Sequence, residues 1–306
     1  MISKEEFLKK CETNIIKKLA SDEEYQSLFR KNLKLIWGIG LMDICMFLSA
    51  FLSWLLFESI ATMGALFLLF FVAVFVSLLL NVKVSNKLSE MNKSVMKNAF
   101  SYFCFYPTGI EVLSPEIIKI SPILNGGEPS LILRNKGTIC ASFYKVSDGG
   151  KRHSLLVSIP YKTPCEAVIT SNSRPSRDFK KIKPSFEHPF FKDNDVFMKD
   201  LSKQSVLLTP NLIEKITKIQ SLLMTETQIE NISLGRDVIF LSNQIAFVFE
   251  TSENEFELSM KSMLLKNLFN FKVLAGKETV MYNINTFETL YNKLSNINQT
   301  IDLLGD

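Results

Sequence analysis

Residues 35–82 read LIWGIGLMDICMFLSAFLSWLLFESIATMGALFLLFFVAVFVSLLLNV, and this stretch decides the predicted fold. Among its 48 residues, the only acidic or basic side chains are Asp43 and Glu58. A helix crosses a bilayer with about 20 consecutive apolar residues, so the stretch is long enough for two spans. We therefore expect transmembrane helices at 35–57 and 60–82, joined by a short turn as an antiparallel hairpin.

Three side chains mark the expected spans. Trp37 and Trp54 lie 17 residues apart, which is about 25 Å along a helix and close to the thickness of the apolar layer. Each indole is therefore expected at a membrane interface. Asp43 would lie inside the first span, where a carboxylate is costly. It either has a structural or assembly role, for example by hydrogen bonding near Ser77, or belongs to a proton or ion path within an oligomer.

The basic residues favour one orientation. They gather just outside both ends of the apolar stretch, at Arg30, Lys31, Lys34, Lys83, Lys87, Lys93 and Lys97, whereas the expected turn holds only Glu58. By the positive-inside rule, both termini face the cytoplasm and the turn faces outwards. A lipid bilayer is thus the first expected partner.

Cysteine and histidine usage argues against metal and redox chemistry. The cysteines at 11, 45, 104, 140 and 165 are scattered and form no C-x-x-C pair, which disfavours a disulfide framework and a zinc site. Nucleophile-elbow, zinc-protease, Walker and dinucleotide motifs are absent from the sequence. We interpret His153 as exposed and His188 as structural. We therefore expect no cofactor, no metal and no catalytic residue, and an enzyme is the less favoured class.

Residue patterning divides the rest of the chain. Residues 1–34 predict amphipathic helices, with Ser3 and Ser21 as N-caps. Residues 83–99 continue the second apolar helix as a stalk. Residues 100–306 carry 23 basic and 22 acidic side chains and predict a cytosolic domain. The expected fold class is α+β: a transmembrane helical hairpin with its stalk, followed by an antiparallel sheet with helices.

Between residues 100 and 170, short apolar runs alternate with turn signals. Glycine-containing turns are expected at 125–127, 135–137 and 148–150. The pattern predicts an antiparallel meander with strands at 110–113, 131–133, 139–146, 155–159 and 167–169.

Residues 171–185 are polar and basic and predict an exposed loop. Their cations are Arg174, Arg177, Lys180, Lys181 and Lys183. A solvated loop and a contact with anionic lipid headgroups are both open interpretations. We do not expect nucleic acid as a partner, because the domain as a whole is not basic.

The C-terminal residues follow a heptad-like pattern. Apolar side chains recur at steps of three and four, at Phe287, Leu290, Leu294, Ile297, Ile301 and Leu304. They predict an amphipathic helix that ends near Gly305. This helix either packs against the domain's own sheet or binds a protein partner or a second copy of the chain.

The last third of the chain resembles a known family. The resemblance rests on Phe186 with Phe190 and Phe191, on the step Leu207-Leu208-Thr209-Pro210 into a helix, and on the hairpin at 239–250. These pieces resemble the domain-of-unknown-function 3137 family, which comprises uncharacterised bacterial membrane proteins with an N-terminal two-helix hairpin and a cytosolic α+β domain. The resemblance implies a bacterial inner-membrane location and supplies no catalytic residues.

The leading functional hypothesis is a non-enzymatic, membrane-tethered scaffold or adaptor that binds a protein partner at the inner leaflet. The alternative is a subunit of an oligomeric membrane channel or transport assembly, with Asp43 inside the helix bundle.

Overall fold

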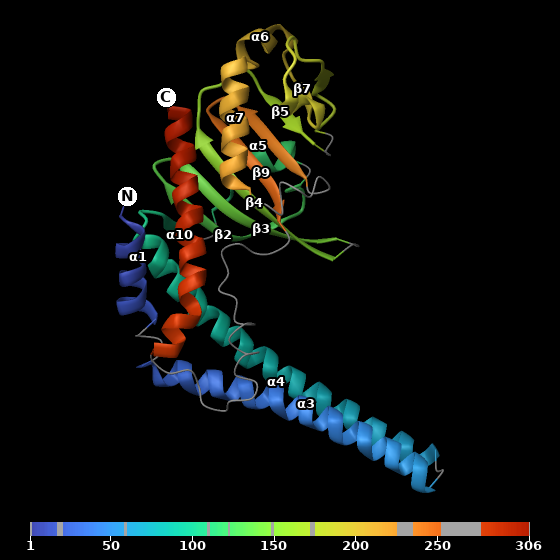
Figure 1. Cartoon of the computed structure of the whole chain (residues 1–306). Helices are drawn as coiled ribbons and strands as arrows, with labels where there is room; N and C mark the ends of the chain where they lie inside the picture. Colours follow the sequence, from blue (N-terminus) through green and yellow to red (C-terminus); the bar gives the residue numbers. More distant parts are fainter. Residues whose placement is uncertain are drawn as a thin grey trace. The chain divides into compact units, whose positions relative to one another are not determined.

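The computed structural model describes residues 2–16, 21–57, 60–108, 111–121, 123–147, 150–171, 175–224, 235–251 and 277–305 (Figure 1). The chain divides into two compact units, which we describe separately. The sheet unit contains the described residues of 100–251 and 289–305, and the hairpin unit contains those of 2–99 and 277–288.

The sheet unit is built on one nine-stranded sheet whose neighbouring strands are all antiparallel. Its spatial order is β1-β2-β3-β4-β9-β8-β5-β7-β6. The strands are β1 (Tyr106–Thr108), β2 (Glu128–Asn135), β3 (Thr138–Ser147), β4 (Gly150–Pro160), β5 (Ala167–Thr170), β6 (Lys180–Ile182), β7 (Asp195–Met198), β8 (Arg236–Leu241) and β9 (Gln244–Thr251).

The turn between β2 and β3 follows directly from the sequence. Lys136 and Gly137 both have positive φ, 47° and 83°. A two-residue hairpin turn of type I′ requires positive φ at both of its central residues, and this turn matches the twist of the flanking strands. A Cβ atom at Gly137 would lie 2.9 Å from the Pro160 side chain, so glycine is needed there for space as well. Part of the expected meander is present as β2-β3-β4, but β9 and β8 lie between β4 and β5. The expected strand at 110–113 is wrong, since residues 111–113 are not in a strand.

Helices cover both faces of the sheet. The short helix α5 (Pro115–Ile120) packs on one face, where its Ile117 and Ile120 join a core with Ile239 and Val248 of the strands. The helix α7 (Pro210–Leu223) lies on the other face (Figure 1). The smaller helical turns are η2 (Pro189–Lys192), η3 (Leu201–Lys203) and α6 (Gln204–Leu207).

The start of α7 is as the sequence predicts. The Thr209 hydroxyl oxygen accepts a hydrogen bond from the Leu212 amide at 3.2 Å, and Pro210 occupies the first turn, where it loses no hydrogen bond. The buried face of this helix comprises Leu212, Ile213, Ile216, Ile219, Gln220 and Leu223.

The hairpin unit is helical. It contains α1 (Lys4–Lys10), a π-helical turn η1 (Cys11–Ile16), the long helix α3 (Glu23–Phe57) and most of α4 (Ile60–Ser101). Ser3 caps α1 as expected, by accepting a hydrogen bond from the Glu6 amide at 3.2 Å. At the start of α3, Asp22 Oδ1 accepts a hydrogen bond from the Tyr25 amide at 2.9 Å.

The membrane predictions are wrong. Among the residues that the structure describes, no helix is long and apolar enough to cross a membrane, since a span needs about 20 consecutive apolar residues. This finding overturns the two expected spans at 35–57 and 60–82, and with them the transmembrane part of the predicted fold class. It equally overturns the predicted placement in a bacterial inner membrane with both termini in the cytoplasm. The fold is α+β, a large antiparallel sheet with helices.

Candidate interaction surface

The helices α3 and α4 expose a large apolar surface. Twelve large apolar side chains on them are each 50% to 70% exposed. We call this set the apolar face: Leu41, Ile44, Leu48, Phe51 and Leu52 on α3, and Leu68, Phe71, Val72, Phe75, Val76, Leu79 and Val82 on α4.

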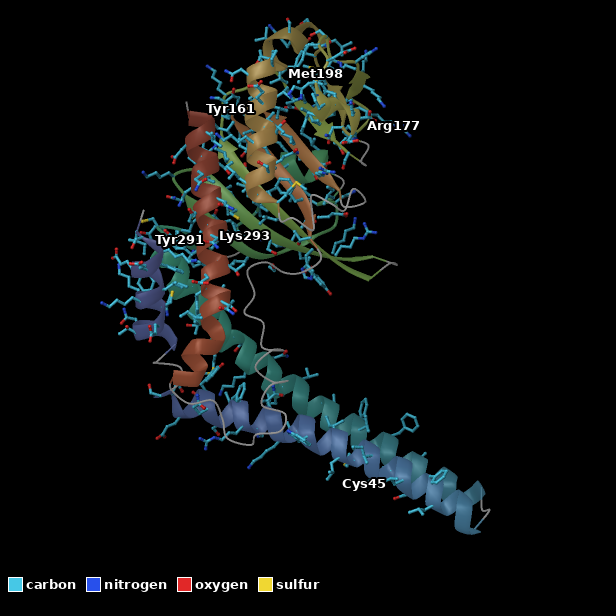
Figure 2. All side chains as sticks on the ribbon, viewed as in Figure 1. Cys45, Tyr161, Arg177, Met198, Tyr291 and Lys293 are labelled. Carbon is cyan, nitrogen blue, oxygen red and sulfur yellow. The ribbon has the colours of Figure 1, made fainter. Side chains whose placement is uncertain are left out.

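The spacing of these residues makes one stripe on each helix. Leu41, Ile44 and Leu48 are separated by three and four residues, and the residues of α4 recur in the same way. Positions with this spacing lie on one side of a helix. Cys45, which Figure 2 labels on α3, is also exposed and lies within the same stripe. Each helix therefore presents a continuous apolar strip.

The size of the apolar face distinguishes it from ordinary surface. From the typical areas of aromatic and aliphatic side chains and their exposed fractions, it offers on the order of 900 Å². The largest apolar patch on a monomeric protein is usually about 300–600 Å². One side of a standard protein–protein interface is about 800 Å². The apolar face is therefore large enough for a stable interface.

Charged residues bound the apolar face at the base of the hairpin. Arg30, Lys31 and Lys34 of α3 are exposed, and so are Lys83 and Lys87 of α4. An open hollow of about 660 Å³ runs along the first turns of α3, lined by Ser21, Glu23, Gln26, Ser27, Arg30, Lys31 and Lys34. An apolar centre with a polar margin is the usual composition of an interface.

The three residues expected to mark the membrane all lie in α3. Trp37 is partly exposed. The side chains of Asp43 and Trp54 are outside the described part of the structure. The sequence analysis assigned the apolar residues around them to lipid and did not single out the twelve exposed side chains, although their spacing of three and four was readable.

The predicted C-terminal seam lies in α10 (Lys277–Gly305). Five of its six residues are buried within the chain, and Ile301 is partly exposed. The buried residues are Phe287, Leu290, Leu294, Ile297 and Leu304. The seam is therefore covered by the chain's own residues.

The structure describes four of the five predicted loop cations. Arg174 lies outside the described residues, and Arg177 and Lys183 are exposed. Lys180 and Lys181 belong to β6, at one edge of the sheet, where lysines hinder pairing with another strand. Lys181 also pairs with Asp195 at 2.6 Å.

The two histidines have structural surroundings. His188 Nδ1 accepts a hydrogen bond from the Phe190 amide at 3.2 Å, and its ring meets that of Phe191 edge to face. His153 on β4 lies beside Tyr144 of β3, with 5.4 Å between ring centroids. No group of three or more potential metal ligands occurs among the described residues.

Lys293, which is partly buried, interacts electrostatically with the buried thiol of Cys140, and the sequence did not predict this. Burial raises the pKa of the Cys140 thiol to about 12 and lowers the pKa of the Lys293 ammonium to about 8. A thiol with so high a pKa stays protonated at neutral pH and is a poor nucleophile. Figure 2 labels Lys293 on α10. The pair therefore does not suggest cysteine-based catalysis.

The chain matches no protein-family model, no curated protein and no solved structure. The resemblance to the domain-of-unknown-function 3137 family stays a prediction.

Proposed function

We propose that this chain is a non-enzymatic scaffold or adaptor protein whose partner at the apolar face is a second copy of the same chain. The observation that carries the proposal is the exposure of twelve large apolar side chains, which form one stripe on each of the two helices α3 and α4. In a dimer, two hairpins pack against each other and two sheet units are held in one assembly.

The energy of burying the apolar face supports a stable dimer. Removing about 900 Å² of apolar surface from water on each copy contributes on the order of 20 kcal/mol per copy. Association costs roughly 4–15 kcal/mol in lost freedom of motion. The apolar term opposes this cost, and the net affinity depends on how closely the two faces pack, since buried area alone does not convert to affinity.

The charges at the base of the hairpin favour an antiparallel dimer. Arg30, Lys31 and Lys34 of one copy would meet the same cations of the other copy in a parallel arrangement, and like charges in contact oppose binding. An antiparallel arrangement about a two-fold axis keeps these cations apart. It places the middle of the α3 stripe near the axis, and Cys45 lies in the middle of that stripe, between Ile44 and Leu48.

Cys45 therefore provides the experiment. The full chain is treated with a flexible bismaleimide cross-linker at low protein concentration and analysed on a denaturing gel. We expect a covalent dimer in the native chain and in Cys104→Ser, which removes an exposed cysteine of the sheet unit. We expect none in Cys45→Ser. A dimer that persists in Cys45→Ser and disappears in Cys104→Ser would overturn the proposal.

A second arm tests the choice of partner. Apolar surfaces of this size mark either protein or membrane contacts. The chain is mixed with phosphatidylcholine–phosphatidylglycerol vesicles and centrifuged on a density gradient, without cross-linker. Under the proposal the chain stays at the bottom as a dimer. Flotation of a monomeric chain with the vesicles would show that lipid, and not a second copy, covers the apolar face.

A further inference from the structure

An acidic side chain lies in the core of the sheet unit. Asp237 on β8 is 0% exposed. Its Oδ2 accepts a hydrogen bond from the Ser121 hydroxyl at 3.1 Å, across 116 residues of sequence. Its Oδ1 is buried and accepts no hydrogen bond from the described residues. A buried oxygen of an ionised carboxylate without a partner is costly.

Ser121 belongs to a short segment that packs on the sheet. The Ser121 amide donates to the Ile117 carbonyl oxygen at 3.0 Å and so ends α5, and the Leu124 amide donates to the Ser121 carbonyl oxygen at 3.2 Å. We call the described residues of 115–127 the α5 segment. Its Ile117 and Leu124 are fully buried against the sheet. The Ser121–Asp237 bond is thus a polar link between this segment and β8.

The charged groups around Asp237 do not neutralise an ionised carboxylate. On β9, Glu250 repels it, and Glu250 is itself paired with Arg152 of β4 at 3.2 Å. Arg236 precedes it on β8 and points to the opposite face, because side chains alternate along a strand.

Among the residues that the structure describes, the other elements packed against Asp237 add no compensating charge. Glu116 and Lys119 of α5 are exposed to solvent. β5 contributes Thr170, which lies opposite Asp237 in the strand register and is uncharged. An ionised Asp237 therefore has the hydroxyl groups of Ser121 and Thr170 beside it and is repelled by Glu250.

We propose that the buried carboxyl of Asp237 forms a pH-sensitive latch beneath the α5 segment. The segment packs on the sheet when Asp237 is protonated and loosens when Asp237 ionises, because the cost of burying the charge exceeds the gain from its hydrogen bond with Ser121. Opening of the α5 segment exposes the carboxyl to water, which favours its ionised form. The latch is therefore closed in acid and weakened near neutral pH.

The direction and size of the effect follow from the proton affinity. Burial raises the pKa of Asp237 to about 6, against an ordinary value of 3.8, while hydrogen bonds from Thr170 and Ser121 oppose the rise. If opening of the α5 segment returns the pKa of Asp237 to its ordinary value, the equilibrium constant for opening increases about tenfold from pH 5 to pH 7.5.

Hydrogen exchange of the full chain tests the latch. Exchange of the Ser121 and Leu124 amides is measured from pH 5 to 7.5 and corrected for the intrinsic pH dependence of exchange. In the native chain we expect about tenfold more opening at pH 7.5, and in Asp237→Asn no change with pH. The amide of Met224, at the end of α7, serves as the internal control and should show neither effect.

The inference is overturned if the native chain shows no pH dependence, or if Asp237→Asn shows the same dependence. Should Asp237→Asn fail to fold, Ser121→Ala gives a second test. The Ser121 hydrogen bond lowers the pKa of Asp237, so its removal should move the transition to higher pH. An unmoved transition would also overturn the inference.

Discussion

Asn296 of α10 donates a hydrogen bond from its side-chain amide to the backbone carbonyl oxygen of Leu222, at 2.9 Å. Leu222 lies in the last turn of α7, where carbonyl oxygens have no partner within the helix. α10 thus satisfies a polar group at the end of α7, and within the sheet unit it is a structural element rather than a free surface.

Replacing Asn296 should destabilise the sheet unit. Asn296→Ala removes the donor and leaves the Leu222 carbonyl oxygen unpaired, which typically costs about 1–2 kcal/mol. Urea denaturation followed by circular dichroism measures the effect. Asn292→Ala, an exposed position on the same helix, is the matched control and should stay within about 0.5 kcal/mol of the native chain. Equal effects of the two substitutions would show that the bond to Leu222 contributes nothing.

A charge in the α10 seam should unfold the sheet unit. Leu294 is 0% exposed, so Leu294→Asp buries an unpaired carboxylate and should cost more than about 3 kcal/mol. The thermal midpoint of the full chain reports this loss. Gln299→Asp, at an exposed position of α10, introduces the same charge and should change the midpoint little. If Leu294→Asp instead leaves the midpoint unchanged and alters only the native mass, the seam is an intermolecular surface.

Stability should depend on pH through Asp237. Its pKa in the folded chain, about 6, lies above its ordinary value of 3.8, so the folded state binds the proton more tightly than the unfolded state. The favourable contribution is complete below about pH 4 and is lost as pH rises through 6, by roughly 3 kcal/mol. Urea denaturation of the native chain and Asp237→Asn, at pH 4 and pH 7, checks this. The difference in unfolding free energy between the two chains should change with pH in this direction, and a constant difference would contradict it.

Removing the partly buried charge of Lys293 should stabilise the fold. Burial lowers its pKa from 10.5 to about 8, so at pH 7 the folded chain holds an ammonium that it disfavours relative to the unfolded chain. The penalty applies below about pH 8 and disappears as pH rises towards 10.5. Lys293→Met should therefore raise the free energy of unfolding at pH 7 by about 1–3 kcal/mol, as measured with urea. Lys218→Met, an exposed lysine of α7, is the control, and a lower stability of Lys293→Met would contradict the expectation.

Local signals in the sequence identified many elements of the fold. Thr209 and Pro210 predict the start of α7, and the glycine after Lys136 predicts the turn between β2 and β3. The predicted strands at 139–146 and 155–159 lie within β3 and β4. These predictions succeed because capping, turn geometry and side-chain alternation depend on neighbouring residues only.

The order of the strands was not readable in the same way. β4 pairs with β9, and β5 pairs with β8. Both pairings join distant parts of the chain. The sequence of an apolar strand does not indicate which of several similar strands it pairs with. The Ser121–Asp237 bond depends on the same long-range arrangement. A region predicted as β-rich also contains the helix α5, which begins at Pro115.

The apolar stretch at 35–82 shows a different limit. Its low charge predicts that the helices are covered by something apolar. An apolar stripe has the same sequence pattern whether lipid or protein covers it, so the pattern does not identify the partner. The prediction of lipid and two spans is wrong. The exposure of the described side chains of α3 and α4 was needed to define the apolar face.

The native mass of the full chain, measured by light scattering in buffer without detergent, tests the proposed self-association most directly. The account predicts twice the chain mass of 34.9 kDa, a single chain mass for Phe75→Asp on the apolar face, and a dimer for Val112→Asp, which changes an exposed residue of the sheet unit. A native chain with the mass of one copy at micromolar concentration would contradict the account.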